Sequence, residues 1–400
     1  MENPGTSDET NKISRFFFQV CRLIYLLGLP NFWSKDFIFS KSFITFYDSF
    51  TKIMNVTTYV FVVTEWGAFY TQQNLNEKQH SDRLVFCISH PILASYRLIL
   101  THHGEKLKEL VYLLCLDLKE KANDEKIEKD TIRKAIIYAT ALVGLCIISI
   151  VSYGIDALAN SISSDATFTT VVTAWPDVGD RSTLAGMARI MFYVIWWIFM
   201  SRVFGAFIIM ISIIVALEHQ YKNLGNYFRN LSKVFEQNLS PIEKEKKYEE
   251  SLKVGIQLHA KTLKCIELAQ ASFGPIFGAQ IILNTYVIVL LLFQMVSSER
   301  TLGNVLATIF TGLAMLLSTG FLMWSGGDIT IEAASLSTDM YWSGWQNCQA
   351  STTGTRKLLA LAMLQAQRPV MIKGLGVITI SYPAYLSIVK SAYSVFSVLY

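Results

Sequence analysis

Ionisable side chains lie inside the long apolar stretches of this 400-residue sequence, among them His90, Arg97, Arg202 and Lys390. In a membrane such groups are costly, so they face protein or water and mark binding sites, ion paths or subunit contacts. Arg97 and Arg202 are long enough to reach towards a membrane surface, but Lys390 lies about sixteen residues into its stretch. That stretch is a candidate pore or interface helix. His90, which precedes Pro91, fits either a helix-packing histidine or a polar group of a ligand pocket.

Aromatic and small polar side chains recur in the outer halves of the second to sixth apolar stretches. An apolar, aromatic cavity with few polar groups suits a small hydrophobic ligand. Aromatic residues in such stretches also serve ordinary helix packing and membrane-surface belts, so both interpretations remain open. The candidate ligand-binding residues are Phe86, His90, Ser149, Tyr153, Phe192, Trp196, Tyr286 and Phe310.

The last residues of the chain alternate small polar side chains with aromatic and aliphatic ones. Phe396 and Tyr400 are four residues apart and share one face of a helix. A narrow ring of such side chains can close a pore by excluding water, which makes the end of this stretch a candidate gate. Ordinary helix packing is the alternative.

Motifs of catalysis and metal binding are missing from the sequence. It has no nucleotide-binding loop, HExxH pair, GxSxG elbow or paired-carboxylate site. The six cysteines lack metal-ligand spacing. The basic residues lie in particular loops instead of on one face, so the net charge of +4 does not indicate nucleic acid. We therefore expect no enzyme activity, no cofactor, no metal site and no nucleic-acid partner.

Seven apolar stretches must position the candidate residues. Hydrophobic residues make up 52% of the chain and charged residues only 16%, against about 25% charged in soluble domains. The hydrophobic residues gather in blocks that are long enough to cross a bilayer, which takes about 20 helical residues. The blocks cover residues 43–70, 84–101, 135–159, 187–216, 272–297, 302–325 and 374–400. The sequence thus predicts an all-α membrane protein with seven transmembrane helices.

The segments that flank and join these stretches differ sharply in basic charge. If the segments are numbered along the chain, those on one side of the membrane contain 27 lysines and arginines in total, and those on the other side contain five. Because basic residues are retained on the cytoplasmic side, the richer set, which includes the N-terminus, is predicted to be cytoplasmic. Seven spans then place the C-terminus outside the cell.

The predicted inner segments carry apolar residues at helical spacing. Such stripes must bury their apolar face against a partner. We expect the second, fourth, fifth and sixth spans to continue inwards as helices and to pack into a bundle with a helix over residues 356–367; the alternative is that the helices lie flat on the inner leaflet. The expected units are residues 1–325 with the first six spans and the ligand pocket, 326–373 as a cytosolic anchor, and 374–400 as a pore-lining seventh helix.

Two stretches near the C-terminus resemble the insect odorant receptor family. After the sixth span, the family has a Gly-rich break, a small-residue helix with a Tyr, and then a Trp; this chain reads SGGDITIEAASLSTDMYWSGW over residues 325–345. A helix that ends in Gln-x-Gln-x-Pro and a final Lys-x-x-Tyr-Ser span follow, as MLQAQRPVMIKGLGVITISYPAYLSIVKSAYSVFSVLY over residues 363–400. The resemblance in motif covers about 80 residues, and the remainder of the chain matches in plan.

The resemblance implies a ligand-gated, non-selective cation channel that binds small volatile hydrophobic odorants. It implies heterotetramers of tuning subunits with the shared co-receptor Orco in the plasma membrane of olfactory sensory neurons. By position it carries the outer gate onto Phe396 and Tyr400, with Leu399 as a register alternative. The chain lacks the large extra inner segment of the co-receptor and so resembles a tuning subunit.

A gustatory-type chemoreceptor channel and a G-protein-coupled receptor are the alternatives. Gustatory receptors share the inverted plan but usually end in a Thr-Tyr and Gln-Phe pattern, whereas this chain has Ala392-Tyr393-Ser394. A G-protein-coupled receptor would have the opposite orientation, and neither its Asp-Arg-Tyr nor its Asn-Pro-x-x-Tyr motif occurs at the expected place.

Overall fold

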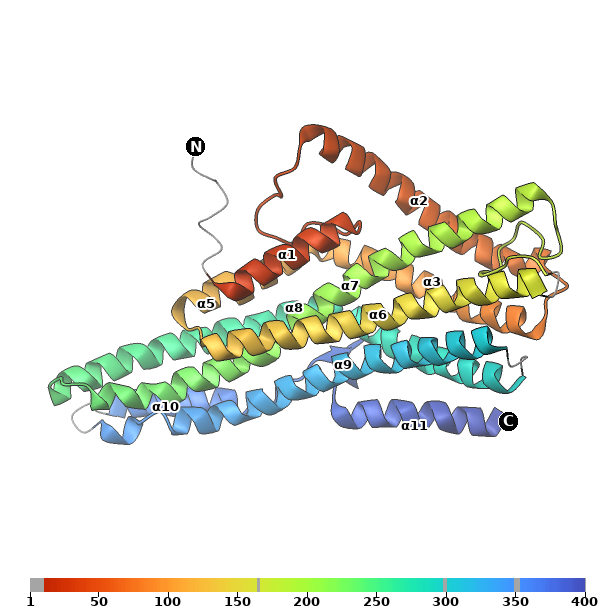
Figure 1. The fold of residues 1–400 in the computed structure, drawn as a ribbon. Coiled ribbons are helices and arrows are strands. Elements are labelled where there is room, and N and C mark those ends of the chain that lie inside the picture. The colour runs from red at the N-terminus through yellow and green to blue at the C-terminus, as the bar shows by residue number, and fades with distance from the viewer. Residues whose placement is uncertain (1–10, 164–165, 298–300, 349–352, 400) are drawn as a thin grey trace.

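The computed structural model describes residues 11–163, 166–297, 301–348 and 353–399, and helices dominate these residues (Figure 1). The α-helices are α1 (Lys12–Leu26), α2 (Lys41–Thr71), α3 (Glu77–His102), α4 (Gly104–Tyr112), α5 (Leu118–Lys121), α6 (Glu125–Ser163), α7 (Thr183–Asn230), α8 (Pro241–Ser297), α9 (Leu302–Tyr341), α10 (Thr353–Ala366) and α11 (Tyr382–Leu399). Short helices of other types cover Leu113–Asp117, Leu231–Glu236 and Trp345–Asn347. Two short strands, β1 (Lys373–Gly374) and β2 (Ile378–Thr379), pair antiparallel. The prediction of an all-helical membrane protein is confirmed at this level.

Polar side chains begin the main helices where the apolar stretches start. The side chain of Ser40 accepts a hydrogen bond from Phe43 N, and that of Ser182 accepts one from Ala185 N. Asn76 and Gln79 form a reciprocal capping box at the start of α3. Such caps satisfy backbone N–H groups that have no partner within the helix, which fixes where each helix begins.

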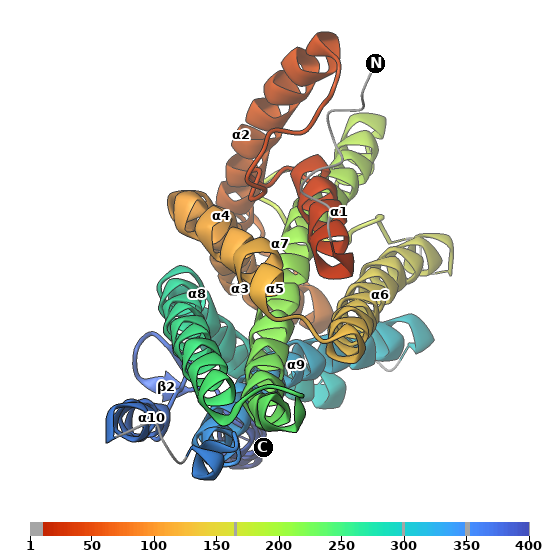
Figure 2. The same ribbon diagram turned by 90° about the vertical axis from the view of Figure 1, so that its left-hand side faces the viewer.

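Helix α7 forms the centre of the bundle and packs against α1, α2, α3, α6, α8 and α9 (Figure 2). Of its most apolar segment, 78% is buried within the chain, against 28% for the corresponding segment of α6. A helix that is apolar all round and is enclosed by other helices belongs to the interior, while α6 presents an apolar face outwards.

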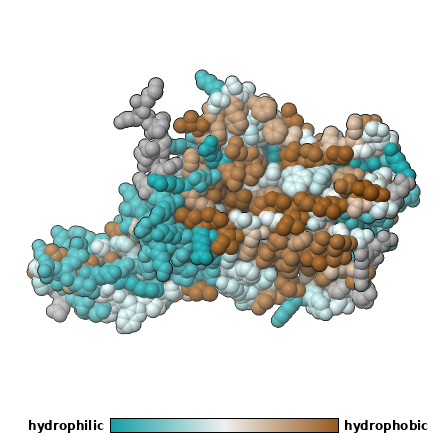
Figure 3. Space-filling view, viewed as in Figure 1, coloured by the Kyte–Doolittle hydropathy of each residue, from teal (hydrophilic) through white to brown (hydrophobic). Residues whose placement is uncertain are grey.

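Five helical segments are long and apolar enough to cross a membrane within the described residues: Glu77–His102, Glu125–Ser163, Thr183–Glu236, Pro241–Val296 and Leu302–Asn347. They match the second to sixth predicted stretches. The first and seventh stretches correspond to α2 and α11, which are helical but are not among these five. Hydrophobic side chains cover a broad band of the surface, and hydrophilic ones gather over the end that contains α10 (Figure 3).

Several long helices extend well past the thickness of a bilayer. The 48 residues of α7 span about 72 Å, whereas the hydrocarbon core measures about 30 Å. Near one end, α7, α8 and α9 lie together, and α10 packs against α9 and α8 (Figure 1). The predicted helical extensions and their packing with the helix near residues 356–367 are therefore present in the fold. The second stretch does not continue inwards as one helix, which corrects the prediction for it. Helix α3 ends at His102, and a separate helix begins at Gly104.

The seventh apolar stretch is not one helix from residue 374, which corrects the prediction. Strands β1 and β2 occupy its start, and α11 begins only at Tyr382. Leu375 and Gly376 have φ angles of 50° and 74°, and this left-handed conformation cannot continue a right-handed helix. Leu375 N also donates to Gly274 O of α8 at 2.9 Å, which holds the hairpin against that helix.

The Gly326-Gly327 pair also differs from its expected role as a break, since α9 runs unbroken through it. The expected division between residues 325 and 326 therefore crosses a continuous helix. Instead of ending α9, these glycines allow the chain before and at the start of α11 to approach closely. An added Cβ on Gly326 would lie 2.4 Å from Ile380 Cγ2, and one on Gly327 would lie 2.6 Å from Tyr382 Cδ2.

Candidate functional site

Four of the predicted ligand-binding side chains meet in one aromatic cluster between α3, α6 and α7. The rings of Phe86 and His90 stack with their centroids 4.9 Å apart, and Phe86 lies edge-on to Trp196 at 5.2 Å. Tyr153 contacts Phe86 at 5.6 Å and Trp196 at 5.7 Å. All four are buried, so the predicted residues of three helices define a single apolar site.

A chain of hydrogen bonds crosses this cluster and orients its histidine. Trp196 Nε1 donates to His90 Nε2 at 3.1 Å, and His90 Nδ1 lies 2.5 Å from Glu65 Oε1. Because indole can only donate, His90 Nε2 must accept, and Nδ1 carries the proton that is donated to Glu65. His90 and Glu65 are 2% and 1% exposed. Within the described residues, Glu65 Oε2 is buried without a hydrogen-bond partner.

Three members of the site were not predicted. Phe61 and Glu65 come from α2, and Phe199 comes from α7; the ring of Phe199 lies 5.1 Å from that of His90. The signal for Glu65 was its charge inside the first apolar stretch, because an acidic group there needs a partner on another helix. Phe61 and Phe199 carried no such signal, since aromatic residues are common in all of the stretches.

The other predicted ligand-binding residues lie at or beyond the edge of the aromatic cluster. Phe192 contacts the cluster through Phe61, at 6.1 Å between ring centroids. Ser149 Oγ is 2.6 Å from Thr311 Oγ1 and so joins α6 to α9. Tyr286 is half-buried and its hydroxyl donates to Leu84 O at 3.5 Å. Phe310 is half-buried on α9 and makes no ring contact with the cluster among the recorded aromatic pairs of the described chain.

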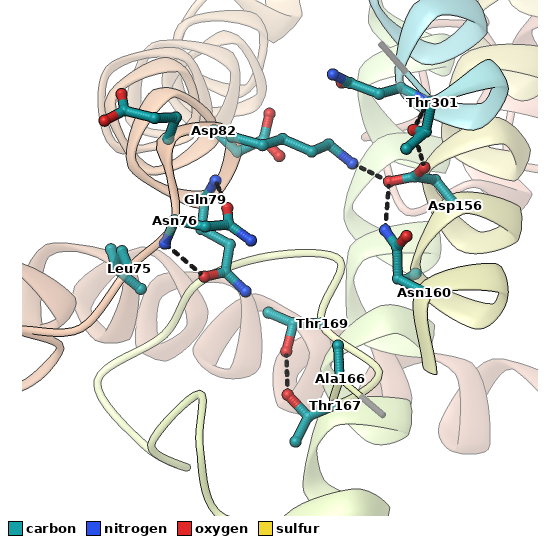
Figure 4. A pocket seen from close by; sticks show the side chains of 14 residues that line it. Leu75, Asn76, Gln79, Asp82, Asp156, Asn160, Ala166, Thr167, Thr169 and Thr301 are labelled. Carbon is teal, nitrogen blue, oxygen red and sulfur yellow. Dashed lines mark hydrogen bonds and ion pairs between the residues drawn. The ribbon is translucent and has the colours of Figure 1, made fainter. Parts of the chain in front are cut away.

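A polar cavity of about 420 Å³ lies next to the cluster, between the start of α3, the last part of α6, the start of α9 and the loop at 166–169 (Figure 4). At its wall Lys78 forms an ion pair with Asp156, which also accepts hydrogen bonds from Thr301 Oγ1 at 3.0 Å and Asn160 Nδ2 at 3.2 Å. These partners neutralise or satisfy a carboxylate that is almost fully buried. The cavity is therefore a built polar space and not merely a packing gap.

Tyr153 connects the polar cavity with the aromatic cluster. Its ring belongs to the cluster, while its hydroxyl donates to Asp82 Oδ1 at 3.4 Å, and Asp82 lines the cavity. Gln294 Nε2 donates to the same carboxylate oxygen at 3.2 Å. The polar cavity and the aromatic cluster are thus neighbours, joined by the contact between Tyr153 and Asp82.

The loop between α6 and α7 folds over the end of α2 near this site. Gln72 Nε2 donates to Thr173 O and Pro176 O, both at 2.9 Å, and Gln72 Oε1 accepts from Val178 N at 3.0 Å. The side chain of Arg189 donates to two further loop carbonyls at 2.6 Å. The loop is consequently fixed in place and covers the bundle, although it has little regular structure.

Helix α11 presents a polar face along one open groove, lined by Ser387, Lys390, Ser391 and Ser394 together with apolar neighbours. Lys390 is exposed in the single chain, and its expected contact with water or another protein surface stays a prediction. Phe396 and Leu399 lie on α11, but their side chains fall outside the described residues, as does Tyr400 entirely. The predicted gate therefore stays a prediction.

A charged network connects the start of α11 with the C-terminal half of α7. The Tyr382 hydroxyl donates to Asp328 Oδ1, and Lys134 Nζ contacts Asp328 Oδ2 at 2.9 Å. Lys134 Nζ also contacts Glu218 Oε2 at 2.6 Å. Four helices, α6, α7, α9 and α11, thus share one set of charge-assisted hydrogen bonds, which are stronger than neutral ones.

Taken with the helical fold, a small apolar site and a separate polar-faced helix are features of a membrane receptor. The comparisons with known proteins make this more specific. The family model described as "7tm Odorant receptor" matches residues 82–393. The chain belongs to the odorant receptor family, whose members are receptors and not enzymes.

Solved structures of the same fold include the insect olfactory receptor OR5 of Machilis hrabei. In complex with eugenol, OR5 superposes with a TM-score of 0.79 at 13% identity, over 97% of this chain and 99% of that one. A second structure of OR5 gives a TM-score of 0.78 at 12% identity, over 96% and 97% of the two chains. A search of curated protein sequences found no match. At this identity the likeness establishes the fold.

Proposed function

We propose that this chain is the tuning subunit of a ligand-gated, non-selective cation channel that opens when a small volatile hydrophobic molecule binds. The observation that carries the proposal is the buried cluster of Phe86, His90, Tyr153 and Trp196 beside a polar cavity, in a chain of the odorant receptor family. Eugenol, an aromatic volatile, is bound by OR5 of Machilis hrabei. A cluster of aromatic rings with one oriented polar chain suits ligands of that kind.

The proposed topology has seven transmembrane helices, with the N-terminus in the cytoplasm and the C-terminus outside. The strong basic bias of alternate segments supports it. In Figure 1 the C-terminal end of α11 lies at the same end of the molecule as the α2–α3 and α6–α7 connections, and α10 lies towards the opposite end. That arrangement fits an outer ligand site and an inner anchor, to which we assign residues 326–373.

Ligand binding would open the channel by favouring one arrangement of helices over another. Burial of an apolar ligand stabilises the complex by about 25 cal/mol per Å², but only a difference in affinity between the open and closed arrangements moves the gate. The network from Glu218 through Lys134 and Asp328 to Tyr382 offers a physical connection between the bundle and α11. Movement of α6 or α7 would be transmitted to the base of α11 through it.

We assign the pore to α11, with Lys390 and its neighbouring serines facing water and with Phe396, Leu399 and Tyr400 near the outer gate. The exposed polar face of the helix supports the first part. The family resemblance of the last residues supports the second. In this proposal the chain assembles with the Orco co-receptor as a heterotetramer in the plasma membrane of olfactory sensory neurons.

The test is whole-cell current in cells that express the chain with Orco, challenged with esters, alcohols, aldehydes and aromatic volatiles in the presence of a G-protein blocker. We expect a fast cation current that needs both subunits and is insensitive to the blocker. A response that the blocker abolishes, with no direct current, would contradict the proposal.

Variants connect that current to the proposed site. Phe86→Ala removes the ring that contacts His90, Tyr153 and Trp196, so the concentration of an active odorant needed for half-maximal current should rise by about tenfold or more. Phe46→Ala is the matched control, because Phe46 is 66% exposed on α2. Equal effects of the two substitutions would place the ligand elsewhere.

A further inference from the structure

Two arginines have no part in the proposed odorant response. Arg97 of α3 and Arg202 of α7 line a small, partly open cavity with Asn55 and Thr58 of α2, and its volume of about 20 Å³ holds about one water molecule, so a larger group would reach the arginines from the open side. Arg202 is only 6% exposed, although it lies in an apolar helix. Its guanidinium has therefore not escaped to a membrane surface but is held inside the bundle.

The turn after α1 holds both guanidinium groups from the opposite side. Arg97 Nε donates to Gly28 O at 3.4 Å, and a Cβ on Gly28 would lie 2.9 Å from Arg202 Nε. Gly28 has a φ of 93°, a conformation that favours glycine. Both the backbone conformation at position 28 and the close approach of Arg202 therefore favour glycine there. The two arginine side chains meet at this turn.

The charges of this pair are not balanced by the part of the protein that the structure describes. The acceptors recorded for Arg97 and Arg202 are the Gly28 carbonyl and, at 2.8 Å from Arg202 Nη1, the amide oxygen of Asn55. Both acceptors are neutral. Each guanidinium keeps its charge in proteins and has five N–H donors, and an unpaired buried charge is strongly destabilising. Water could satisfy donors here, but only an anion would balance the charge.

The surroundings indicate which anion would reach this place. The N-terminal half of α2 lies apart from the bundle (Figures 1 and 2), and α2 exposes Val56 and Val60 next to the cavity-lining Asn55 and Tyr59. The cavity therefore borders a surface that is suited to lipid. Arg97 is five residues from the end of α3 at His102, about 8 Å along the helix axis. A lipid headgroup at that end of the helix is close enough to meet both arginines.

We propose that Arg97, Arg202 and Asn55 bind the phosphate group of an anionic phospholipid between α2, α3 and α7. The phosphate accepts charge-assisted hydrogen bonds from both guanidiniums, whose planar donors match its oxygens. The Asn55 amide holds Arg202 in place from α2. The lipid then joins α2 to the remainder of the bundle. In the orientation proposed above, this lipid belongs to the cytoplasmic leaflet.

The experiment measures lipid retention by native mass spectrometry. The full-length chain, purified in complex with its co-receptor, is mixed with detergent micelles that contain dioleoylphosphatidylserine or dioleoylphosphatidylcholine. We expect phosphatidylserine to be retained on the wild-type chain, and Arg97→Gln and Arg202→Gln each to lower its retention about tenfold, as loss of a charged hydrogen bond would. Arg97→Lys and Arg202→Lys keep the charge and should retain more lipid than the glutamine variants.

Lys52→Gln is the matched control, because Lys52 is exposed on α2 three residues from Asn55 and its loss removes the same charge. Equal loss of lipid in Lys52→Gln would indicate general attraction to a basic surface and would overturn the site. Unchanged retention in an Arg97→Gln, Arg202→Gln double variant would overturn it too. Arg97→Gln changes a half-buried side chain, so it remains informative if Arg202→Gln fails to fold, as judged by gel filtration.

A third arm adds inorganic phosphate in place of lipid. If millimolar phosphate raises the thermal unfolding temperature of the wild-type chain as much as phosphatidylserine does, the ligand is a free anion and the lipid assignment is wrong. Neither readout depends on odorants or current, so failure of this proposal is distinguishable from failure of the proposed channel function.

Discussion

The two halves of α7 are held in different ways: the C-terminal half is almost fully buried, whereas the N-terminal half, which is the outer one in the proposed topology, exposes Leu184, Met187 and Ile190 on one side. The outer half packs Trp196 and Phe199 into an aromatic cluster, where the Trp196–His90–Glu65 chain is a rare polar feature. The C-terminal half, the inner one in the proposed topology, carries Glu218, which binds Lys134 of α6, and Gln220, which binds Lys119 of α5. Aromatic pairs accept more than one geometry, such as offset-stacked and edge-to-face, while hydrogen bonds need a narrow range of distance and angle.

This difference separates two tasks along one helix. A cluster held by rings can rearrange around ligands of different shape at modest cost, which suits recognition of hydrophobic molecules. A network of buried ion pairs keeps one geometry, and the stability of the fold falls sharply when one partner is removed. The outer half is thus the adaptable part of the helix and the inner half the fixed part. The predictions below test that distinction, from the largest expected effect to the smallest.

Lys134→Met should have the largest effect. It leaves Glu218, which is 1% exposed, without one of its two lysine partners and removes the connection to Asp328. We expect a loss of about 2–3 kcal/mol in unfolding free energy, because a buried charge loses its main counter-charge. Fluorescence-detected gel filtration after heating measures this. Lys121→Met, at an exposed position near the same end, is the control, and equal melting of the two variants would contradict a fixed inner network.

Gly327→Ala should displace α11. The added Cβ would lie 2.6 Å from a ring carbon of Tyr382, so the base of α11 must shift, at a cost of about 1–3 kcal/mol. Gly312→Ala is the control on the same helix, since its nearest neighbour would be Leu291 Cδ1 at 3.9 Å; it should be neutral or slightly stabilising. Odorant-evoked current and melting temperature are the measurements. Identical behaviour of the two variants would show that the contact at Gly327 is unimportant.

Trp196→Phe should cost less, about 1 kcal/mol, because it keeps one ring in the cluster while it removes the second ring of the indole and the hydrogen bond to His90. The apparent affinity for odorants should change more than stability does, since His90 and Glu65 lose their orientation. Trp197→Phe, at the next and half-buried position, is the control. A large loss of stability in Trp196→Phe would mean that the outer half is as rigid as the inner half.

Lys119→Met should reveal a small pH effect in the inner region. Burial lowers the pKa of Lys119 from its usual value near 10.5 to about 8. Folding thus favours the neutral amine, so this group makes the chain more stable as pH rises from about 8 towards 10.5 and contributes no pH dependence well below 8. The melting temperature of the wild-type chain should therefore rise relative to Lys119→Met between pH 7.5 and 9.5. Parallel curves would contradict the shift.

Sequence patterns identified the helices and much of the outer site because both depend on local composition. The ring of Trp196 and the imidazole of His90 were recognisable as unusual groups in apolar stretches. Their partner Glu65 was visible as a charge, but its pairing with His90 depends on how α2 packs against α3. Neither periodicity nor hydropathy carries that information, so the pair could not be derived from the sequence.

The C-terminal region is a second place where the sequence pattern could not predict the structure. A hydropathy pattern cannot distinguish a short hairpin from the first turns of a helix, so the expected start at residue 374 was wrong by about two turns. The Gly326-Gly327 pair was recognised as a motif, but its role became clear only through contacts with Ile380 and Tyr382. In each case tertiary contact decides the role of a residue whose local pattern is ambiguous.

The burial of α7 has a consequence for how the protein is made. The C-terminal half of this helix, over residues 207–223, buries Glu218 and is almost fully enclosed, so it has little surface that suits lipid alone. Its partner α9 ends at Tyr341, more than 100 residues after the end of α7 at Asn230. At about 5–20 residues per second, the ribosome needs roughly 6–20 s to complete that partner. During this interval α7 must be sheltered by the insertion machinery or by a chaperone, which makes biogenesis of the chain dependent on cellular assistance.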